Sequence, residues 1–257
     1  IYDRGPGAHR IMDLMENYEH WDITWGNHDI MWMDAAACND ACICNVIRLS
    51  LRYSNLATLE EGYGINLVPL ATFAMEAYKD DPCEEFMPKF SGGAENMDAK
   101  TQRLTAQMHK AIAVMQFKVE AQLYHKHPEW KMEERDLLSH IDYKTGTITL
   151  EGNTYQMKSC HFPTIDPANP TKLTEEEEAL MHHLRHFFML SEKLHRHLSA
   201  MLAHGCMYGI YNGNLLFHAS VPLNEDGTLK EVEIRPGHKR GARICCRLLP
   251  VSMVRTK

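Results

Sequence analysis

One short segment of the sequence gathers side chains that could hold a metal ion and move a proton. Gly26, Asn27, His28 and Asp29 follow residues 22–25, which read as a short strand. An amide oxygen is a hard ligand for a divalent cation, and an imidazole held by a carboxylate can deliver a proton to a leaving group. The same residue types also make good helix N-caps, and on their own they favour a cap.

The first five residues favour a functional site over a helix cap. They read Ile-Tyr-Asp-Arg-Gly, and Asp3-Arg4-Gly5 followed by the Gly-Asn-His-Asp of residues 26–29 resembles the calcineurin-like metallophosphoesterases. In that superfamily an Asp-x-His motif and a Gly-Asp pair precede the Asp-Arg-Gly, and two more His ligands follow. Because neither precedes Ile1, we expect this chain to be a fragment of a longer enzyme.

A third segment is an apolar strand that ends in His218. A His at a strand end is common, but beside the other two motifs it resembles the strand-end His ligand of the superfamily. Ala219 stands where that superfamily usually has Gly, which affects the tightness of the turn rather than the ligand.

The detailed resemblance is to class III fructose-1,6-bisphosphatase, a bacterial enzyme of gluconeogenesis, and it runs from residue 1 to about residue 234. The segments that carry it are 2–7, 25–33, 63–67, 116–118, 211–216 and the His-x-x-x-Pro turn at 218–222. The long spacing between Asn27 and His218 favours this enzyme over protein Ser/Thr phosphatases, which place the corresponding His much sooner. From Arg235 onward we expect the family pattern to stop.

This resemblance implies metal-dependent hydrolysis of fructose 1,6-bisphosphate to fructose 6-phosphate and phosphate in the cytoplasm, with this piece inactive alone. Asn27 and His218 would bind one ion of a binuclear Mn²⁺ site. Arg4 would bind phosphate oxygens as a planar fork. His28 would protonate the departing sugar oxygen, and Asp3 would hold the His28 ring.

The sequence leaves two other functions open. The chain carries only two of the expected metal ligands, so one alternative is a non-catalytic α/β remnant or binding module. The other is a different calcineurin-like phosphatase, such as a protein Ser/Thr phosphatase. The resemblance assigns Asp29 a bracing role in the loop rather than a chemical one.

The amino-acid composition limits the kinds of partner that the chain could bind. The 257 residues are 44% hydrophobic and 24% charged, as in ordinary soluble globular proteins, and the net charge of −7 gives no footprint for nucleic acid. No apolar run approaches the roughly 20 residues of a membrane-spanning helix. The eight Cys show no paired zinc spacing and no compact disulfide framework. We expect a sugar bisphosphate as partner, neither nucleic acid nor membrane, and the oligomeric state, including a homo-oligomer, stays open.

The fold class that the resemblance implies is α/β, a partial calcineurin-like core with a large, mainly helical insertion. We assign 1–59 to the core, 60–205 to the insertion with one β-hairpin, 206–234 to the return to the core, and 235–257 to a basic tail. The tail has seven Lys or Arg and no acid, and a frame error is our hypothesis for it.

Within these regions, periodicity predicts the elements. Residues 1–29 predict a strand end, a helix and a strand, the helix bearing an apolar stripe of Ile11, Leu14, Met15 and Tyr18. Further predictions are a helix over 30–53, a strand, turn and helix over 56–79, a loop over 80–98, a long helix to His127, a hairpin over 147–157 around Gly152-Asn153, a helical stretch from the Thr174/Glu177 capping box to about 204, and a hairpin over 208–217.

The predicted helical stretch before residue 204 carries a cluster of His. Its members are His182, His183, His186, His195, His197 and His204. No acidic residue has the spacing of a helical zinc motif, so we expect these side chains on a solvated face rather than around a metal.

Overall fold

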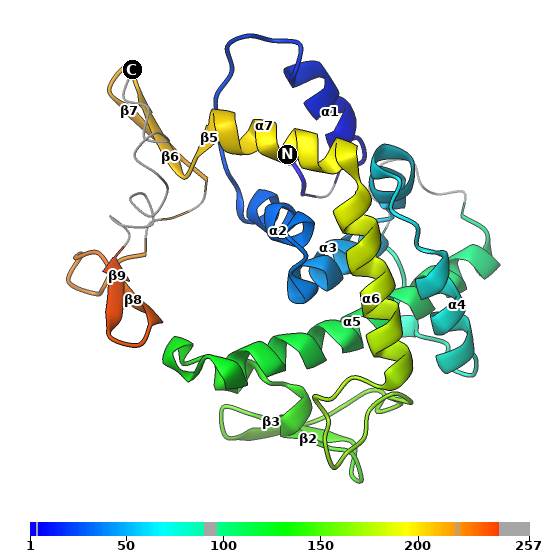
Figure 1. The fold of residues 1–257 in the computed structure, drawn as a ribbon. Coiled ribbons are helices and arrows are strands. Elements are labelled where there is room, and N and C mark those ends of the chain that lie inside the picture. The colour runs from blue at the N-terminus through cyan, green and yellow to red at the C-terminus, as the bar shows by residue number, and fades with distance from the viewer. Residues whose placement is uncertain (4, 90–96, 219, 221, 242–257) are drawn as a thin grey trace.

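The computed structural model describes residues 1–3, 5–89, 97–218, 220 and 222–241, and Arg4 and the segment from 242 onward lie outside it. Figure 1 shows helices that pack around one another, with small sheets at the edges. The α-helices are α1 (Ala8–Met15), α2 (Asn27–Ala36), α3 (Asp40–Arg52), α4 (Val68–Ala77), α5 (Ala99–Lys126), α6 (Glu175–Leu190) and α7 (Glu192–His204). Short helical turns are the π-turn η1 (Thr58–Gly62) and the 3₁₀ turns η2 (Glu84–Phe86), η3 (Pro128–Trp130), η4 (Glu133–Arg135) and η5 (Leu138–His140).

The strands are short and form separate sheets. They are β1 (Ile23–Thr24), β2 (Ile141–Asp142), β3 (Thr147–Leu150), β4 (Asn153–Gln156), β5 (Gly205–Cys206), β6 (Tyr208–Tyr211), β7 (Asn214–Phe217), β8 (Glu231–Arg235) and β9 (His238–Gly241). β1 pairs with β5 in parallel, whereas β2–β3–β4, β6–β7 and β8–β9 are antiparallel. The described residues therefore form a mixed α/β structure in which helices dominate.

Helices α3, α4, α5 and α6 enclose the core. In Figure 1, α5 runs along one side of the molecule, and α6 and α7 form a bent arm that crosses over it. The arm bends at Ser191, whose hydroxyl donates to the carbonyl of Tyr63 at 2.6 Å. The middle of α5 is buried on nearly all sides, and even Lys118 is buried there, paired with the carboxylate of Glu177 at 2.6 Å. Within the described residues, no helix is long and apolar enough to cross a membrane.

The β1–β5 pair joins the beginning of the chain to its return. Ile23 pairs with Gly205, and the N–H of Trp25 donates to the carbonyl of Cys206 at 2.9 Å. The indole Nε1 of Trp25 donates to the carbonyl of Met201 at 3.0 Å, directly over Gly205. A β-carbon at Gly205 would overlap both the indole nitrogen and this carbonyl, so the approach requires glycine.

The predicted first unit of the chain was partly wrong. Residues 1–3 form no strand, and the parallel partner of β1 is β5. The helix is present, but the buried side chains of α1 are Ala8 and Met12, whereas Ile11, Leu14 and Tyr18 are exposed. The spacing of apolar residues gave the helix, but it did not identify which face packs against α7.

Two other predictions need correction. The single helix expected over 30–53 is two helices, because Cys38 takes a left-handed conformation (φ 64°) and the Asn39 side chain accepts the N–H of Cys42 at 3.2 Å to start α3. The strand expected soon after residue 56 is the π-turn η1, followed by α4.

The predictions for the long helix, the 174–204 stretch and the two hairpins are confirmed, whereas β2 and the β8–β9 hairpin were not predicted, and residues 90–96 of the predicted 80–98 loop lie outside the described residues. α5 ends at Lys126, just before the predicted boundary, and the Thr174/Glu177 capping box starts α6. Both hairpins are present, with turns at Glu151-Gly152, one residue before the predicted position, and at Asn212-Gly213. The division into core, insertion and tail stays a prediction.

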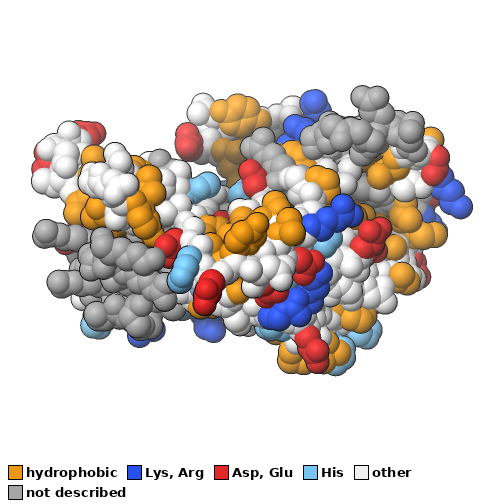
Figure 2. All heavy atoms as spheres, turned by 90° about the horizontal axis from the view of Figure 1, so that it is seen from above, with side chains coloured by type: hydrophobic (Ala, Val, Ile, Leu, Met, Phe, Trp, Pro, Cys, Tyr) orange, Lys and Arg blue, Asp and Glu red, His pale blue; other side chains and the backbone are white. Residues whose placement is uncertain are grey.

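The β6–β7 hairpin leads to His218 and is largely exposed. Figure 2 shows hydrophobic side chains gathered at the left end of the molecule, on the side where β6 and β7 lie. The exposed residues of the hairpin are Ile210, Leu215, Leu216 and Phe217. Within the described residues no second layer covers this hairpin.

Candidate functional site

Asp3 and His28 face each other where the N-terminal segment passes the start of α2. The His28 Nε2 lies 3.2 Å from Asp3 Oδ1, so an imidazole and a carboxylate form an ion-pair contact. The side chains are 27% and 55% exposed, respectively, which leaves both accessible from outside. A carboxylate at this distance can orient the ring and stabilise its protonated form.

The carboxylate of Asp29 connects the N-terminal segment that carries Asp3 to the start of α2, which carries His28. Its carboxylate is buried and accepts the N–H of Tyr2 at 3.0 Å and the N–H of Gly26 at 2.9 Å. Burial raises the pKa of the Asp29 carboxyl, whereas these two backbone donors lower it. The bracing role expected for Asp29 is confirmed, since one carboxylate ties Tyr2 to the start of α2.

His218 returns to the same loop from the end of β7. Its ring lies against Gly26: a β-carbon built there would be 2.9 Å from Cε1, 3.0 Å from Nε2 and 3.1 Å from Nδ1. The backbone of Gly26 is extended (φ −88°), so a β-carbon there would add no backbone strain, and its effect would be to push the exposed His218 ring aside. The imidazole of His218 therefore lies beside the residue that precedes Asn27. The side chains of Asn27 and His218 are both exposed.

An amide oxygen and an imidazole nitrogen at one loop make a reasonable donor set for a divalent cation. The His218 ring occupies the space that a side chain at residue 26 would fill. This places the ring beside the residue that precedes Asn27, and the placement fits a metal site shared by Asn27 and His218. Arg4, the expected phosphate ligand, lies outside the described residues.

A small cavity adjoins the Asp3–His28 pair. Its volume is about 10 Å³, which is room for about one water, and its polar lining includes Asn45, Ser50 and Thr58. The cavity is too small for a molecule much larger than water, so a larger molecule could contact His28 only from its exposed side.

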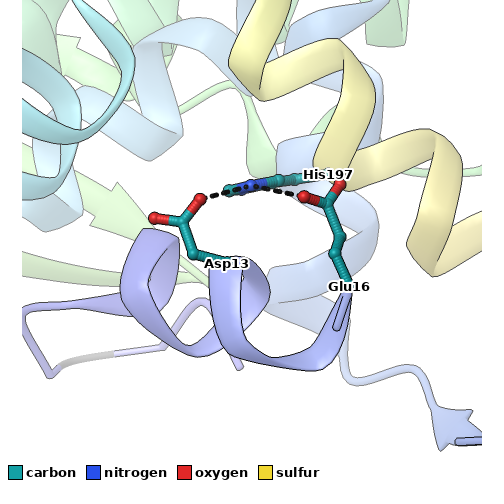
Figure 3. A group of neighbouring side chains, drawn as sticks. All are labelled: Asp13, Glu16 and His197. Carbon is teal, nitrogen blue, oxygen red and sulfur yellow. Dashed lines mark hydrogen bonds and ion pairs between the residues drawn. The ribbon is translucent and has the colours of Figure 1, made fainter. Parts of the chain in front are cut away.

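Sequence reasoning missed a second cluster, formed by α1 and α7 (Figure 3). The His197 Nε2 lies 3.2 Å from Asp13 Oδ1 and 3.6 Å from Glu16 Oε2. The three side chains bring potential metal-ligand atoms within 4.8 Å of one another. Lys193 already contacts Asp13 at 2.7 Å and Arg196 contacts Glu16 at 3.1 Å, so two cations of the protein balance the two carboxylates.

The expectation of a solvated His face is therefore only partly right. His182, His183 and His186 are exposed, as predicted, but His197 is 0% exposed. The signal that could have found it is its place beside Leu198 on the apolar stripe that includes Leu194 and Met201, all of which are buried.

Comparison with known proteins identifies relatives along nearly all of the chain. A family model described as Firmicute fructose-1,6-bisphosphatase matches residues 1–248, which extends past Arg235, where the pattern was expected to stop. Fructose-1,6-bisphosphatase class 3 of Bacteroides thetaiotaomicron is 56% identical over 235 residues, covering 91% of this chain and 35% of that protein. The proteins of the same name from Parabacteroides distasonis and Clostridium novyi are 55% and 53% identical over 234 residues, again 91% of this chain and 35% of each relative. The chain thus spans about a third of the length of these curated relatives, and no solved structure matches it.

Proposed function

This chain belongs to the Firmicute fructose-1,6-bisphosphatase family, and we propose that it is part of an enzyme that hydrolyses fructose 1,6-bisphosphate to fructose 6-phosphate and phosphate. The single observation that carries the proposal is that four expected site residues lie at or against one loop. Asp3 contacts His28 at 3.2 Å, and the His218 ring lies against Gly26 immediately before Asn27. The proposal concerns the complete gene product, in the cytoplasm.

For the fold, we propose that residues 1–59 and 206–234 are parts of a calcineurin-like core, and that residues 60–205 are an insertion into it. The parallel β1–β5 pair supports this, because Thr24 of the first proposed core segment pairs with Cys206, the first residue of the second. Parallel strands of such sheets place their loops at one edge, where open α/β sheets bind ligands. The residues that follow β1 are Trp25 to His28, and these carry the site.

Asn27 and His218 are the proposed ligands of one Mn²⁺ ion. Such an ion, when bound, ionises a water at neutral pH and neutralises charge on the phosphoryl group. The donor set suits Mn²⁺, which accepts hard oxygen and imidazole ligands. A β-carbon at residue 26 would force the His218 ring out of its present position beside Asn27.

The remaining chemistry is assigned to residues of the chain itself. His28 would donate a proton to the sugar oxygen as the phosphate ester breaks. Asp3 would keep the ring oriented and favour its protonated form. Arg4 would bind phosphate oxygens through two parallel N–H groups, which a lysine could not do.

The test is a substrate comparison on the complete gene product with Mn²⁺. We expect phosphate release from fructose 1,6-bisphosphate and little from a phosphopeptide. Preference for the phosphopeptide would instead favour a protein phosphatase. A complete product that binds Mn²⁺ tightly but hydrolyses neither substrate would favour the binding-module alternative.

A further inference from the structure

A chain of buried polar side chains runs from the Asp13–Glu16–His197 cluster towards the candidate site. The hydroxyl of Tyr2 lies 2.5 Å from the hydroxyl of Tyr63, which lies 3.1 Å from the Nδ1 of His197. The opposite ring nitrogen, Nε2, lies 3.2 Å from an oxygen of Asp13. Four side chains from four separate segments thus form one continuous series of hydrogen-bond contacts.

Burial disfavours the charged forms of the three members of this series other than Asp13. Tyr2, Tyr63 and His197 are all buried. Burial raises the pKa values of both tyrosines above their ordinary range. Burial lowers the pKa of His197, and although the carboxylates of Glu16 and Asp13 oppose this, the pKa stays below its ordinary value.

The carboxylate at one end sets the direction of every hydrogen bond. A carboxylate only accepts, so the Nε2 of His197 carries the hydrogen and donates to Asp13. The neutral ring then has Nδ1 as acceptor, and Tyr63 must donate to it. The oxygen of Tyr63 is therefore left to accept from Tyr2, and every buried polar atom of the series has a partner.

Reversing the series would leave a buried donor without a partner. If Nδ1 carried a hydrogen, it would donate to Tyr63, which would then donate to Tyr2, and the hydroxyl hydrogen of Tyr2 would have to find another acceptor. The Nη2 of Arg196 lies 3.4 Å from the Nε2 of His197 and would favour this reversed order. Asp13, at 3.2 Å, is the nearer partner of the His197 Nε2, and Arg196 also places its Nε 3.1 Å from both oxygens of Glu16.

The series ends beside the residue that orients His28. The ring of Tyr2 lies 4.7 Å from that of Trp32 in α2, and its N–H donates to Asp29. The side chain and the backbone of Tyr2 are therefore both fixed. Asp3 is the next residue, so the position of its carboxylate against His28 depends on how Tyr2 is held.

We propose that His197 is a positioning residue for this active site, and that it acts through Tyr63 and Tyr2 to hold Asp3 against His28. The proposal rests on the proposed function for its catalytic meaning, but its structural content can be measured separately. The other charged or titratable groups that the structure places around the series are Lys193 and Arg196 from α7, His9 from α1, Glu16 directly after α1, and Asp29 from α2.

The first measurement is ¹⁵N NMR of the imidazoles in the complete gene product at neutral pH. We expect His197 as the neutral tautomer with hydrogen on Nε2 and none on Nδ1. A ring protonated on Nδ1, either as the other tautomer or as the imidazolium, would overturn the direction of the series and with it the proposal.

The second measurement follows the His28 signals and turnover in variants. Tyr2→Phe removes one hydroxyl, and we expect it to move the His28 signals towards those of Asp3→Asn and to lower kcat on the order of tenfold. His197→Leu should do the same, and His197→Gln, which offers a donor and an acceptor, should recover most of the loss. Tyr18→Phe, on the exposed side of the chain after α1, is the matched control and should change neither.

Unmoved His28 signals in both Tyr2→Phe and His197→Leu would overturn the positioning role. If His197→Leu fails to fold, Tyr2→Phe alone still decides, because it removes only an oxygen. A wild-type protein without activity on fructose 1,6-bisphosphate would refute the proposed function, whereas the tautomer and the His28 signals would still report on the series.

Discussion

The imidazole of His218 packs against the α-carbon of Gly26, with ring atoms 2.9 to 3.1 Å from the place where a β-carbon would lie. A residue at the end of β7 is thereby brought to the loop between β1 and α2. The contact depends on the absence of a side chain at position 26.

Gly26→Ala should therefore displace His218 and weaken metal binding. The backbone at Gly26 is extended, so alanine adds no backbone strain, and the clash with the ring is its main effect. Loss of metal affinity on the order of 10–100-fold is expected, as for other changes that move a ligand from outside the coordination sphere. Metal titration of the complete gene product measures it. In a His218→Ala background, Gly26→Ala should have no further effect, and normal affinity in Gly26→Ala alone would contradict the shared site.

His28→Ala should affect two substrates differently. A sugar alkoxide needs a proton as it leaves, whereas nitrophenolate needs far less help. General acid catalysis is typically worth ~10²–10⁴-fold, so a loss of about that order is expected on fructose 1,6-bisphosphate and a much smaller loss on p-nitrophenyl phosphate. Asp3→Asn should show the same pattern more weakly. Equal losses on both substrates would exclude the acid role, and loss of metal would make His28 a ligand instead.

Arg4→Lys should lower turnover of the complete enzyme with little change in its free energy of unfolding. The substitution keeps the charge but removes the planar pair of donors. Steady-state kinetics and chemical denaturation give the two quantities. Arg10→Lys, on the exposed face of α1, is the matched control. Wild-type kinetics in Arg4→Lys would remove Arg4 from the site.

Gly205→Ala should destabilise the junction between β1 and β5. Its β-carbon would overlap the indole nitrogen of Trp25 and the carbonyl of Met201, and overpacking of this kind costs about 1–3 kcal/mol or more. Chemical denaturation measures the change. Trp25→Phe removes the indole nitrogen, so the double variant should lose less stability than the sum of the two single losses. Strict additivity would show that the overlap is relieved elsewhere.

His109 should make the protein less stable as the pH falls from about 6.5 to about 4. It is buried, and its Nδ1–H donates to the carbonyl of Phe86 at 2.8 Å. Burial lowers the pKa of His109 to about 4, although the bond to Phe86 opposes this. The unfolded state, with a pKa near 6.5, binds the proton first, so protonation favours unfolding by up to about 3 kcal/mol across this window.

His109→Asn keeps a donor for the Phe86 carbonyl but does not titrate there. Denaturation at a series of pH values should show a flatter dependence between pH 4 and 6.5 than the wild type shows. His186→Asn, on the exposed side of α6, should leave the dependence unchanged. An unchanged slope in His109→Asn would mean that His109 titrates normally in the folded state.

Local features of the chain were readable from the sequence because they depend on neighbouring residues. Asn212-Gly213 can both take positive φ, which closes the β6–β7 hairpin, and Thr174 with Glu177 caps α6 reciprocally. The Gly-Asn-His-Asp loop follows a short strand, as expected. It is also held locally, because the Asp29 carboxylate accepts the N–H of Gly26 three residues earlier.

Contacts between distant segments were decided only by the tertiary structure. Nothing local to residues 1–29 shows that β1 pairs with β5, or that α1 turns Met12 rather than Leu14 to the core, because both depend on where α7 lies. His197 reads as a surface residue in a His-rich helix, yet it is buried, because α1 covers it with two carboxylates and Tyr63 meets its other nitrogen. Sequence spacing fixes which residues share a face of a helix, but burial depends on the partner that the fold brings to that face.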